Sequence, residues 1–395
     1  MQLWYWISLA AVSLSALVSG YHVALGMVAA VPRRRPRRSA AEHSRFAILI
    51  PAHNEETSIS ASVASCLSQD YPAEKYFVLV IADNCTDRTA ELARAAGAEC
   101  LERFDRARSG KGAALAWGIP QALAKPCDAV LIVDADCALD AGALRALDRH
   151  VAAGHQAVQL NNVPSNADDC PTSYLLAVAN KLENDFFYAP KDRLGLAVLL
   201  RGTGMMLARQ LLQECPWEAQ SLTEDSEYSM RLFRRGQRIR FEPSAAVRSA
   251  APVSRDQLTA QRTRWISGQR DVATSHAWSL VRDAVSRLDL RLLDAAWTNF
   301  VLTRALVLAI VVGAVATTAV AALLTDDVRI RGLSVVSLLS LGGFAAYVAA
   351  GVVAFGLSKQ RMRLLALAVP LVFSYCTLTL RASLQRNGAW SRMQR

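Results

Sequence analysis

The chain has 395 residues, of which 52% are hydrophobic and 20% are charged, and its formal net charge is +10. This length accommodates one soluble domain of about 250 residues together with membrane spans, and the composition fits that mixture better than a purely soluble protein. Five arginines between Arg33 and Arg38 directly follow an apolar segment, and no basic stripe with interleaved aromatic residues occurs elsewhere. Nucleic acid is therefore not an expected partner, and the charge favours a membrane boundary.

The N-terminal residues 1–31 are predicted to form a transmembrane helix. Leu3 to Val31 contains no charged residue and is longer than the roughly 20 residues that cross a bilayer. A signal peptide would carry its basic residues before a shorter apolar core, whereas here they follow it. The positive-inside rule then makes residues 32–45 a basic cytoplasmic linker.

Residues 46–253 show the alternation of short apolar runs and helical periods that is typical of an α/β domain. Phe46 to Ile50, Phe77 to Ala82 and Ala129 to Val133 are predicted strands. Helical segments such as Ile59 to Leu67 and Leu144 to Val151 follow them. The alternation predicts a Rossmann-like, mostly parallel sheet with helices on both faces and a ligand site beyond the carboxyl ends of the strands.

The rest of the chain is predicted to be membrane-associated. Residues 254–300 contain an Arg- and Gln-rich helix and a second helix that suits the membrane surface. In residues 301–380, Ala305 to Leu324 and Leu333 to Leu357 are predicted spans. The apolar run from Leu364 to Leu380 is slightly short for a span, so a re-entrant or interfacial segment and a full crossing both stay open. Residues 381–395 form a basic tail.

Acidic residues recur where the predicted strands end. Glu55 follows the first strand, Asp83 ends the second, Asp134 and Asp136 follow the third, and Asp225 lies further on. Each one alone is compatible with a turn or a helix cap. Together they form a cluster of like charges that is unfavourable unless a cation or a proton joins it. The D-x-D spacing of Asp134 and Asp136 suits Mg²⁺ or Mn²⁺ completed by substrate phosphates.

Three further segments carry chemistry. In SGKGAA, glycines around Lys111 allow close approach to phosphates, although the spacing is not that of a Walker loop. In QRTRW, Gln261, Arg264 and Trp265 share one helical face and suit either a diphosphate and a sugar ring or a membrane interface. In TEDSEY, Glu224 and Asp225 precede an amphipathic helix whose N-terminus is expected to favour their ionised form.

The ordered set IPAHNEE, VIADNCTDRT, GKGAAL, VDADC, RGTGMM, TED and QRTRW is similar to family 2 glycosyltransferases of the membrane-bound kind. That group includes cellulose, hyaluronan and poly-N-acetylglucosamine synthases and also ceramide glucosyltransferase. The resemblance implies a GT-A fold for residues 46–253 and an inverting transfer from a UDP-sugar.

The resemblance also implies roles for individual residues. Asp225 would be the catalytic base, and Asp134 and Asp136 would hold the metal ion. The expected donor-binding residues are Pro51, His53, Glu55, Asp83, Lys111, Asp134, Gln261 and Arg264. The expected acceptor-binding residues are Gly202, Thr203, Gly204, Glu224 and Trp265.

Two acceptors remain open. The first hypothesis is extension of a β-linked exopolysaccharide at the cytoplasmic face of the inner membrane, with accessory or export subunits as possible partners. The alternative is addition of a single sugar to a lipid acceptor, either a polyprenyl-linked glycan or a glycolipid. Three or four helices are few for a polymer channel within one chain. A catalytically silent scaffold would be expected to lack some of the motif carboxylates, and all of them are present.

Overall fold

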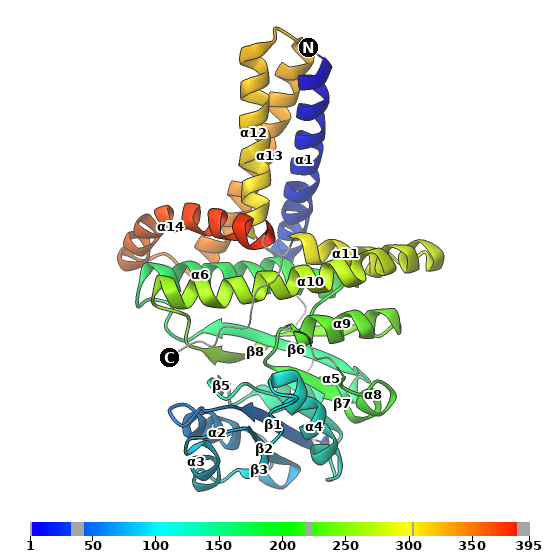
Figure 1. The fold of residues 1–395 in the computed structure, drawn as a ribbon, viewed down its shortest axis with the longest axis vertical. Coiled ribbons are helices and arrows are strands. Elements are labelled where there is room, and N and C mark those ends of the chain that lie inside the picture. The colour runs from blue at the N-terminus through cyan, green and yellow to red at the C-terminus, as the bar shows by residue number, and fades with distance from the viewer. Residues whose placement is uncertain (1, 33–42, 219–220, 222, 302–303, 385–395) are drawn as a thin grey trace.

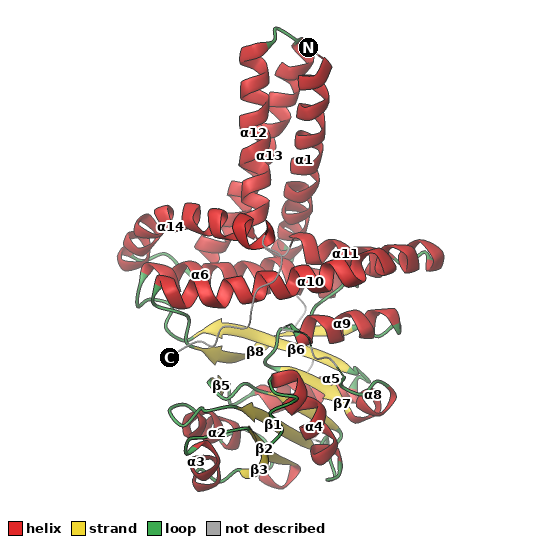
Figure 2. Cartoon of the chain, in the orientation of Figure 1, coloured by secondary structure: helices red, strands yellow, loops and turns green. Residues whose placement is uncertain are grey.

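The computed structural model describes residues 2–32, 43–218, 221, 223–301 and 304–384. Most of the predicted linker (residues 32–45) and most of the basic tail (residues 381–395) therefore lie outside the described residues. Figure 1 shows three tiers: an upright helical bundle, a layer of helices lying across its base, and an α/β domain beneath. Figure 2 shows that the strands are confined to this lowest tier.

Within the described residues, eight strands form one sheet in the order β3-β2-β1-β4-β7-β6-β8-β5. The strands are β1 (Phe46–Ala52), β2 (Tyr76–Asp83), β3 (Glu99–Arg103), β4 (Ala129–Ile132), β5 (Cys137–Leu139), β6 (Ala157–Pro164), β7 (Met205–Ala208) and β8 (Ile239–Ser249). The three strands predicted from apolar runs correspond to β1, β2 and β4, whereas β3 was not predicted.

The sheet is parallel from β3 through β2 and β1 to β4, as the sequence predicts. Beyond β4 it is mixed, because β7 runs antiparallel to both β4 and β6, and β5 runs antiparallel to β8. The β6–β8 pair is parallel, with a register shift after Leu160. Residues 196–204, which lead into β7, belong to no helix or strand.

Helices cover both faces of the sheet. They are α2 (Ile59–Leu67), α3 (Thr89–Ala95), α4 (Lys111–Leu123), α5 (Ala143–Ala152), α6 (Pro171–Glu183), α7 (Ala189–Leu194), α8 (Arg209–Glu214) and α9 (Glu224–Arg234), with a 3₁₀ turn at Ala73–Lys75 and a π-helical turn at Asn184–Tyr188. The prediction of a helix from Ile59 to Leu67 is confirmed, and the one from Leu144 to Val151 lies within α5.

Side-chain alternation along β1 separates two cores. Ala47 and Leu49 pack in a cluster with α4 residues such as Leu115, whereas Ile48 and Ile50 pack in a second cluster that includes residues of α2, α3 and α5. This is the period of two that a strand buried on both faces requires. The first cluster also contains Val18 from the N-terminal helix, so the domain and the bundle share one core.

The remaining helices are α1 (Gln2–Ala30), α10 (Arg255–Arg287), α11 (Leu290–Val301), α12 (Arg304–Leu324), α13 (Val328–Phe355) and α14 (Lys359–Leu384). Among the described residues, α1, α12 and α13 are long and apolar enough to cross a membrane. These three form the upright bundle, and the N-terminus lies at its far end beside the α12–α13 connection (Figure 1).

Polar side chains join the bundle helices inside their shared interior. The hydroxyl of Ser19 in α1 donates to the carbonyl oxygen of Ser340 in α13 at 2.7 Å. The hydroxyl groups of Thr318 in α12 and Ser337 in α13 lie 3.1 Å apart. Helix α14 differs from the three bundle helices, because it lies across the base of the bundle beside α6 and α10 (Figure 1).

Candidate active site

Lys111 is the centre of a polar cluster at the carboxyl end of β4. Its ammonium nitrogen lies 2.6 Å from Oδ1 of Asp134 and 3.6 Å from Oε1 of Glu224, and it donates to the carbonyl oxygen of Gly202 at 2.7 Å. Burial alone would lower the pKa of Lys111, but Asp134 and Glu224 raise it above its usual range. The lysine therefore stays charged and joins three segments that are distant in sequence.

Asp225 occupies the first turn of α9, directly beside this cluster. Its Oδ1 accepts a hydrogen bond from the backbone N–H of Ser226 at 2.7 Å. Its Oδ2 would lie 3.5 Å from a Cβ built on Gly202, an ordinary contact distance, so the Gly202 loop passes directly beside the carboxylate. Burial and the charge of Glu224 raise the pKa of Asp225 to about 7, while Lys111 opposes the shift.

This raised pKa corrects one expectation from the sequence. The helix N-terminus was expected to favour the ionised form of the carboxylates, an effect of roughly 0.3 to 1 kcal/mol. Burial and a second carboxylate at Glu224 outweigh it, because both favour the protonated form. Asp225 is thus a group that gains and loses its proton near neutral pH, which suits a general base.

The Gly202–Gly204 loop connects Asp134 to the sheet. Both glycines have positive φ, +79° and +67°, a region that other residues rarely adopt. The hydroxyl oxygen of Thr203 accepts from the backbone N–H of Asp134 at 3.0 Å. A Cβ on Gly204 would come within 2.8 Å of Val247, so glycine is required there by space as well as by backbone conformation.

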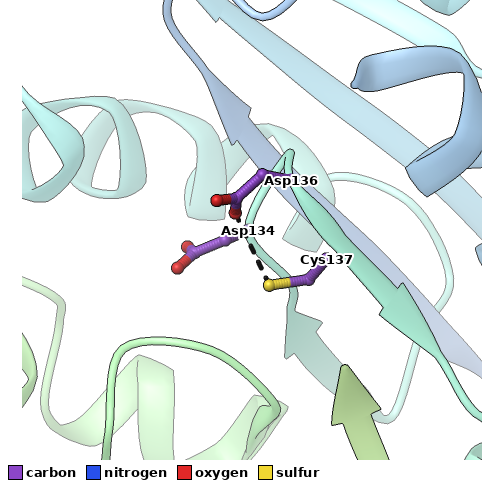
Figure 3. Close-up of side chains that lie close together, drawn as sticks. All are labelled: Asp134, Asp136 and Cys137. Atoms are coloured by element: carbon purple, nitrogen blue, oxygen red, sulfur yellow. Dashed lines mark hydrogen bonds between the residues drawn. The ribbon is translucent and has the colours of Figure 1, made fainter. Parts of the chain in front are cut away.

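The D-x-D pair forms a candidate metal centre. Ligand atoms of Asp134, Asp136 and Cys137 lie within 4.8 Å of one another, and Figure 3 shows both carboxylates pointing to the same side of the chain. The Cys137 sulfur lies 3.6 Å from Oδ1 of Asp136 and is buried, and burial raises the pKa of its thiol. Because hard divalent ions such as Mg²⁺ or Mn²⁺ prefer oxygen ligands to sulfur, the donors that fit such an ion are the two carboxylates.

The predicted donor-binding residues of the first two loops lie at the neighbouring strand ends. Asp83 is 3% exposed, and its Oδ1 accepts from Arg103 Nη1 at 2.5 Å. His53 Nδ1 lies 2.6 Å from the Asp83 carbonyl oxygen, and Glu55 accepts from the Ser58 hydroxyl at 2.8 Å. Pro51 is buried in β1 beside Ile81. Asp83 thus anchors the loop after β3, and its contact with a nucleotide stays a prediction.

A pocket that the sequence did not predict opens beside Asp83. It has a volume of about 310 Å³ and is lined by Asn84, Cys85, Thr86, Phe104 and Arg106. Phe104 is 74% exposed although it directly follows a strand. The sequence does show Phe104 as an aromatic residue in a polar loop. Because β3 was not predicted, the sequence did not place that residue at the end of a strand. An exposed ring and a guanidinium at this place suit a planar, anionic ligand.

The QRTRW motif lies in α10, where Gln261 is partly buried and Trp265 is 41% exposed. The side chain of Arg264 lies outside the described part of the chain. One turn later, a Cβ on Gly268 would come within 2.6 Å of Thr223, the residue before α9. Helix α10 therefore passes in close contact with the start of the helix that carries Asp225, and the ligand contacts of the motif stay predictions.

The structure thus brings together Lys111, Asp134, Gly202, Glu224 and Asp225, with Asp136 and the Asp83 loop adjoining them. Sequence comparison identifies the class of protein that this arrangement defines. The family model described as "Glycosyltransferase like family 2" matches residues 43–268, more than half of the chain. The chain therefore belongs to glycosyltransferase family 2, a family of transferases, as the motifs indicate.

The curated relatives that match the chain are named for different products. The chain is 29% identical over 263 residues to a beta-monoglucosyldiacylglycerol synthase of Nostoc sp., which covers 64% of this chain and 54% of the relative. It is 25% identical over 260 residues to a poly-beta-1,6-N-acetyl-D-glucosamine synthase of Staphylococcus aureus, with 63% and 60% covered. The match thus spans little more than half the length of these curated relatives.

Among solved structures, the chain resembles the mannosyltransferase PcManGT from Pyrobaculum calidifontis, solved in complex with GDP-Man and Mn²⁺. The TM-score is 0.61 at 17% sequence identity, and the match covers 96% of this chain and 99% of that one. This likeness shows the fold, and with the family match it confirms the predicted GT-A domain; α1 before that domain and α12 and α13 after it are long and apolar enough to cross a membrane.

Proposed function

We propose that the protein is an inverting glycosyltransferase that moves one sugar from a nucleotide sugar, expected to be a UDP-sugar, to a lipid acceptor at the membrane surface. The observation that carries the proposal is the convergence of Asp225 with the Lys111–Asp134 pair across the Gly202 loop. A base on one side and charge-balancing groups on the other are what inversion at an anomeric carbon requires.

Each group has a chemical task in this reaction. Asp225 takes the proton from the acceptor hydroxyl as that oxygen attacks the anomeric carbon from the face opposite the diphosphate. Lys111 balances negative charge on the departing diphosphate, and Glu224 holds Asp225 in its proton-accepting range. Asp134 and Asp136 would hold a divalent ion, which supplies further charge stabilisation on the leaving group when bound. No covalent intermediate on the protein is needed.

The bundle geometry supports a lipid acceptor over an exported polymer. Three helices are long enough to cross a membrane in the described part of the chain, and the residues in their interior are buried side chains that contact one another. A polymer needs a lumen wide enough for a sugar, which a closely packed three-helix bundle does not supply. Polymer extension, the first hypothesis from sequence, becomes the second candidate, supported by the likeness to a poly-N-acetylglucosamine synthase.

The proposed location is the inner membrane, with the catalytic domain in the cytoplasm. The three candidate spans carry the domain at one common end (Figure 1), and α14 lies across that end with Arg361 and Arg363 near its start. This supports an interfacial place for α14, one of the two alternatives left open for residues 364–380. Accessory or export subunits would be required only by the polymer hypothesis.

The experiment is a transfer assay on membranes that contain the full chain. Radiolabelled UDP- and GDP-sugars are supplied one at a time, and the products are separated by lipid extraction and sized. A lipid-extractable product that carries one added sugar supports the proposal, and membranes with Asp225→Asn provide the inactive control. A long, water-soluble polymer would instead select the second candidate, and no product with any donor would reject both.

Metal dependence is tested separately. We expect Asp136→Ala to weaken Mn²⁺-dependent nucleotide binding by at least about tenfold, because the D-x-D pair then loses one of its two hard ligands. Titration calorimetry with UDP, with and without Mn²⁺, measures the effect, and Asp140→Ala, at a carboxylate that pairs with Arg248 instead, is the matched control. Equal metal dependence in wild type and Asp136→Ala would contradict this role.

A further inference from the structure

The segment that leads into the Gly202–Gly204 loop is held by side chains from other elements. Residues 196–201 belong to no helix or strand, and Ala197 to Leu200 are at most 2% exposed. The backbone N–H of Ala197 donates to Asp294 Oδ2 at 2.8 Å, that of Leu200 to the Ser229 hydroxyl at 3.0 Å, and that of Arg201 to Gln159 Oε1 at 2.8 Å. The place of the loop therefore depends on these three side chains.

Asp294 differs from the other two anchors because it also binds the membrane bundle. Its Oδ1 accepts from the hydroxyl of Tyr21, in the candidate span α1, at 2.6 Å. Its Oδ2 lies 3.0 Å from the ammonium nitrogen of Lys191, in α7. Lys191 is fully buried and also donates to the hydroxyl of Thr298, one turn further along α11. One carboxylate thus joins α1, α7, α11 and the segment before the loop.

A buried ion pair is a weak source of stability, because removing two charges from water offsets much of their attraction. Its best-attested use is to select one arrangement of the elements that it joins. Here the Lys191–Asp294 pair lies at the point where Asp294 joins the backbone of Ala197, five residues before Gly202, to Tyr21 of the bundle helix α1.

We propose that Asp294 is a positioning residue that fixes the Ala197–Arg201 segment to membrane helix α1 and so sets the place of the Gly202–Gly204 loop beside Asp225. Lys191 keeps the Asp294 carboxylate in place. This inference rests on the proposed function, since its consequence is that an acceptor emerging from the membrane meets the base at a fixed depth.

The test compares two double variants that both remove the buried charges. Asp294→Asn/Lys191→Met retains an oxygen that accepts the Ala197 N–H, whereas Asp294→Leu/Lys191→Met does not. Both are measured as full-length protein in lipid nanodiscs by hydrogen exchange of peptides that cover residues 196–204, by UDP binding, and by kcat in the transfer assay. Asp185→Asn, which breaks the partly exposed Lys181–Asp185 pair, is the control.

We expect the Leu-containing variant to exchange the Ala197 amide at least about tenfold faster and to lose about tenfold in kcat, with the Kd for UDP within twofold of wild type. The Asn-containing variant should retain kcat within about threefold. Unchanged exchange and kcat in the Leu-containing variant would overturn the proposal, as would an equal loss in both variants, because the contact to Ala197 would then be irrelevant. If the wild type transfers sugar to no lipid, the proposed function fails, whereas the exchange comparison still tests Asp294.

Discussion

The two halves of the sheet hold their functional loops by different means. In the half from β3 to β4, contacts between the loops that follow two adjacent strands fix the motifs: Thr86 donates its backbone N–H to Asn54 Oδ1 at 2.8 Å, and Glu55 donates its own to the Thr89 hydroxyl at 2.8 Å. In the half from β7 to β5, side chains from α4 and β6 hold the Gly202–Gly204 loop, and side chains from α9 and α11 hold the segment before it. The loops of the first half are thus held by each other, whereas those of the second half depend on side chains from several other elements.

The largest expected effect concerns Asp225, where the two halves meet. We expect Asp225→Asn to lower kcat by about 10³-fold, because the amide cannot accept the acceptor proton. The Kd for UDP should stay within about twofold, since the nucleotide loops of the first half do not depend on this side chain. Single-turnover kinetics and equilibrium binding measure the two quantities.

Glu224→Gln is the matched control, because it changes the neighbouring carboxylate and leaves the base in place. It should retain substantially more activity than Asp225→Asn. If Glu224→Gln were instead less active than Asp225→Asn, the assignment of Asp225 as the sole base would be wrong. Glu224 would then take part in accepting the proton.

Substitution of two glycines with positive φ, one in each half of the sheet, compares how strongly each half depends on glycine for stability. Gly204→Ala in the second half should lower the free energy of unfolding by about 2–4 kcal/mol, because strain adds to a clash 2.8 Å from Val247. Gly110→Ala in the first half meets nothing within 4 Å, so only backbone strain, about 1–3 kcal/mol at φ +107°, is expected. Thermal unfolding in detergent checks the ranking, and equal shifts would show that packing around Gly204 is loose.

A pH profile tests the environment of the base. Because the pKa of Asp225 is raised to about 7, the ionised fraction falls tenfold for each pH unit below 7. We expect kcat/KM to fall about 50-fold between pH 7 and pH 5, because about half of Asp225 is ionised at pH 7, and to rise by no more than about twofold above pH 7. Glu224→Gln should move the break to lower pH, since it removes the nearby negative charge. A level profile from pH 5 to 8 would contradict this assignment.

The smallest effect is expected in the first half, at the pocket after β3. Phe104→Ala should raise the donor KM about tenfold with little change in kcat, because a ring that stacks on a base contributes roughly 1–3 kcal/mol. Phe104→Tyr, which preserves the ring, should restore the KM to near that of wild type. An unchanged KM in Phe104→Ala would show that the nucleobase lies elsewhere.

The contrast between the halves explains what the sequence could predict. The strands β1, β2 and β4 are continuous apolar runs followed by polar motifs, so their register and the rim position of Asp83 and Asp134 follow from local patterns. The short strand β3, with exposed Glu99 and Glu102, lacks such a run and was missed, and the pocket beside Phe104 with it.

In the second half, the sequence indicated Asp225 and the glycine loop by resemblance but not the reasons for their placement. The pKa of Asp225 depends on burial by distant elements, which no local pattern reports. Likewise, Lys191 in α7 and Asp294 in α11 are far apart in the sequence, and only the assembled structure shows that they meet. Arg264 stays a prediction, because its side chain lies outside the described residues.

The core shared between the domain and the bundle has a consequence for biogenesis. The Ser19–Ser340 hydrogen bond joins residues 321 positions apart, so α1 is synthesised long before the helix that completes its packing. Until α12 and α13 are made, the face of α1 that includes Val18 lacks its partners in the bundle. The order of synthesis thus postpones assembly of the α/β domain's membrane support until α12 and α13 exist, and a stop before them would leave an exposed apolar surface on α1 for quality-control proteases.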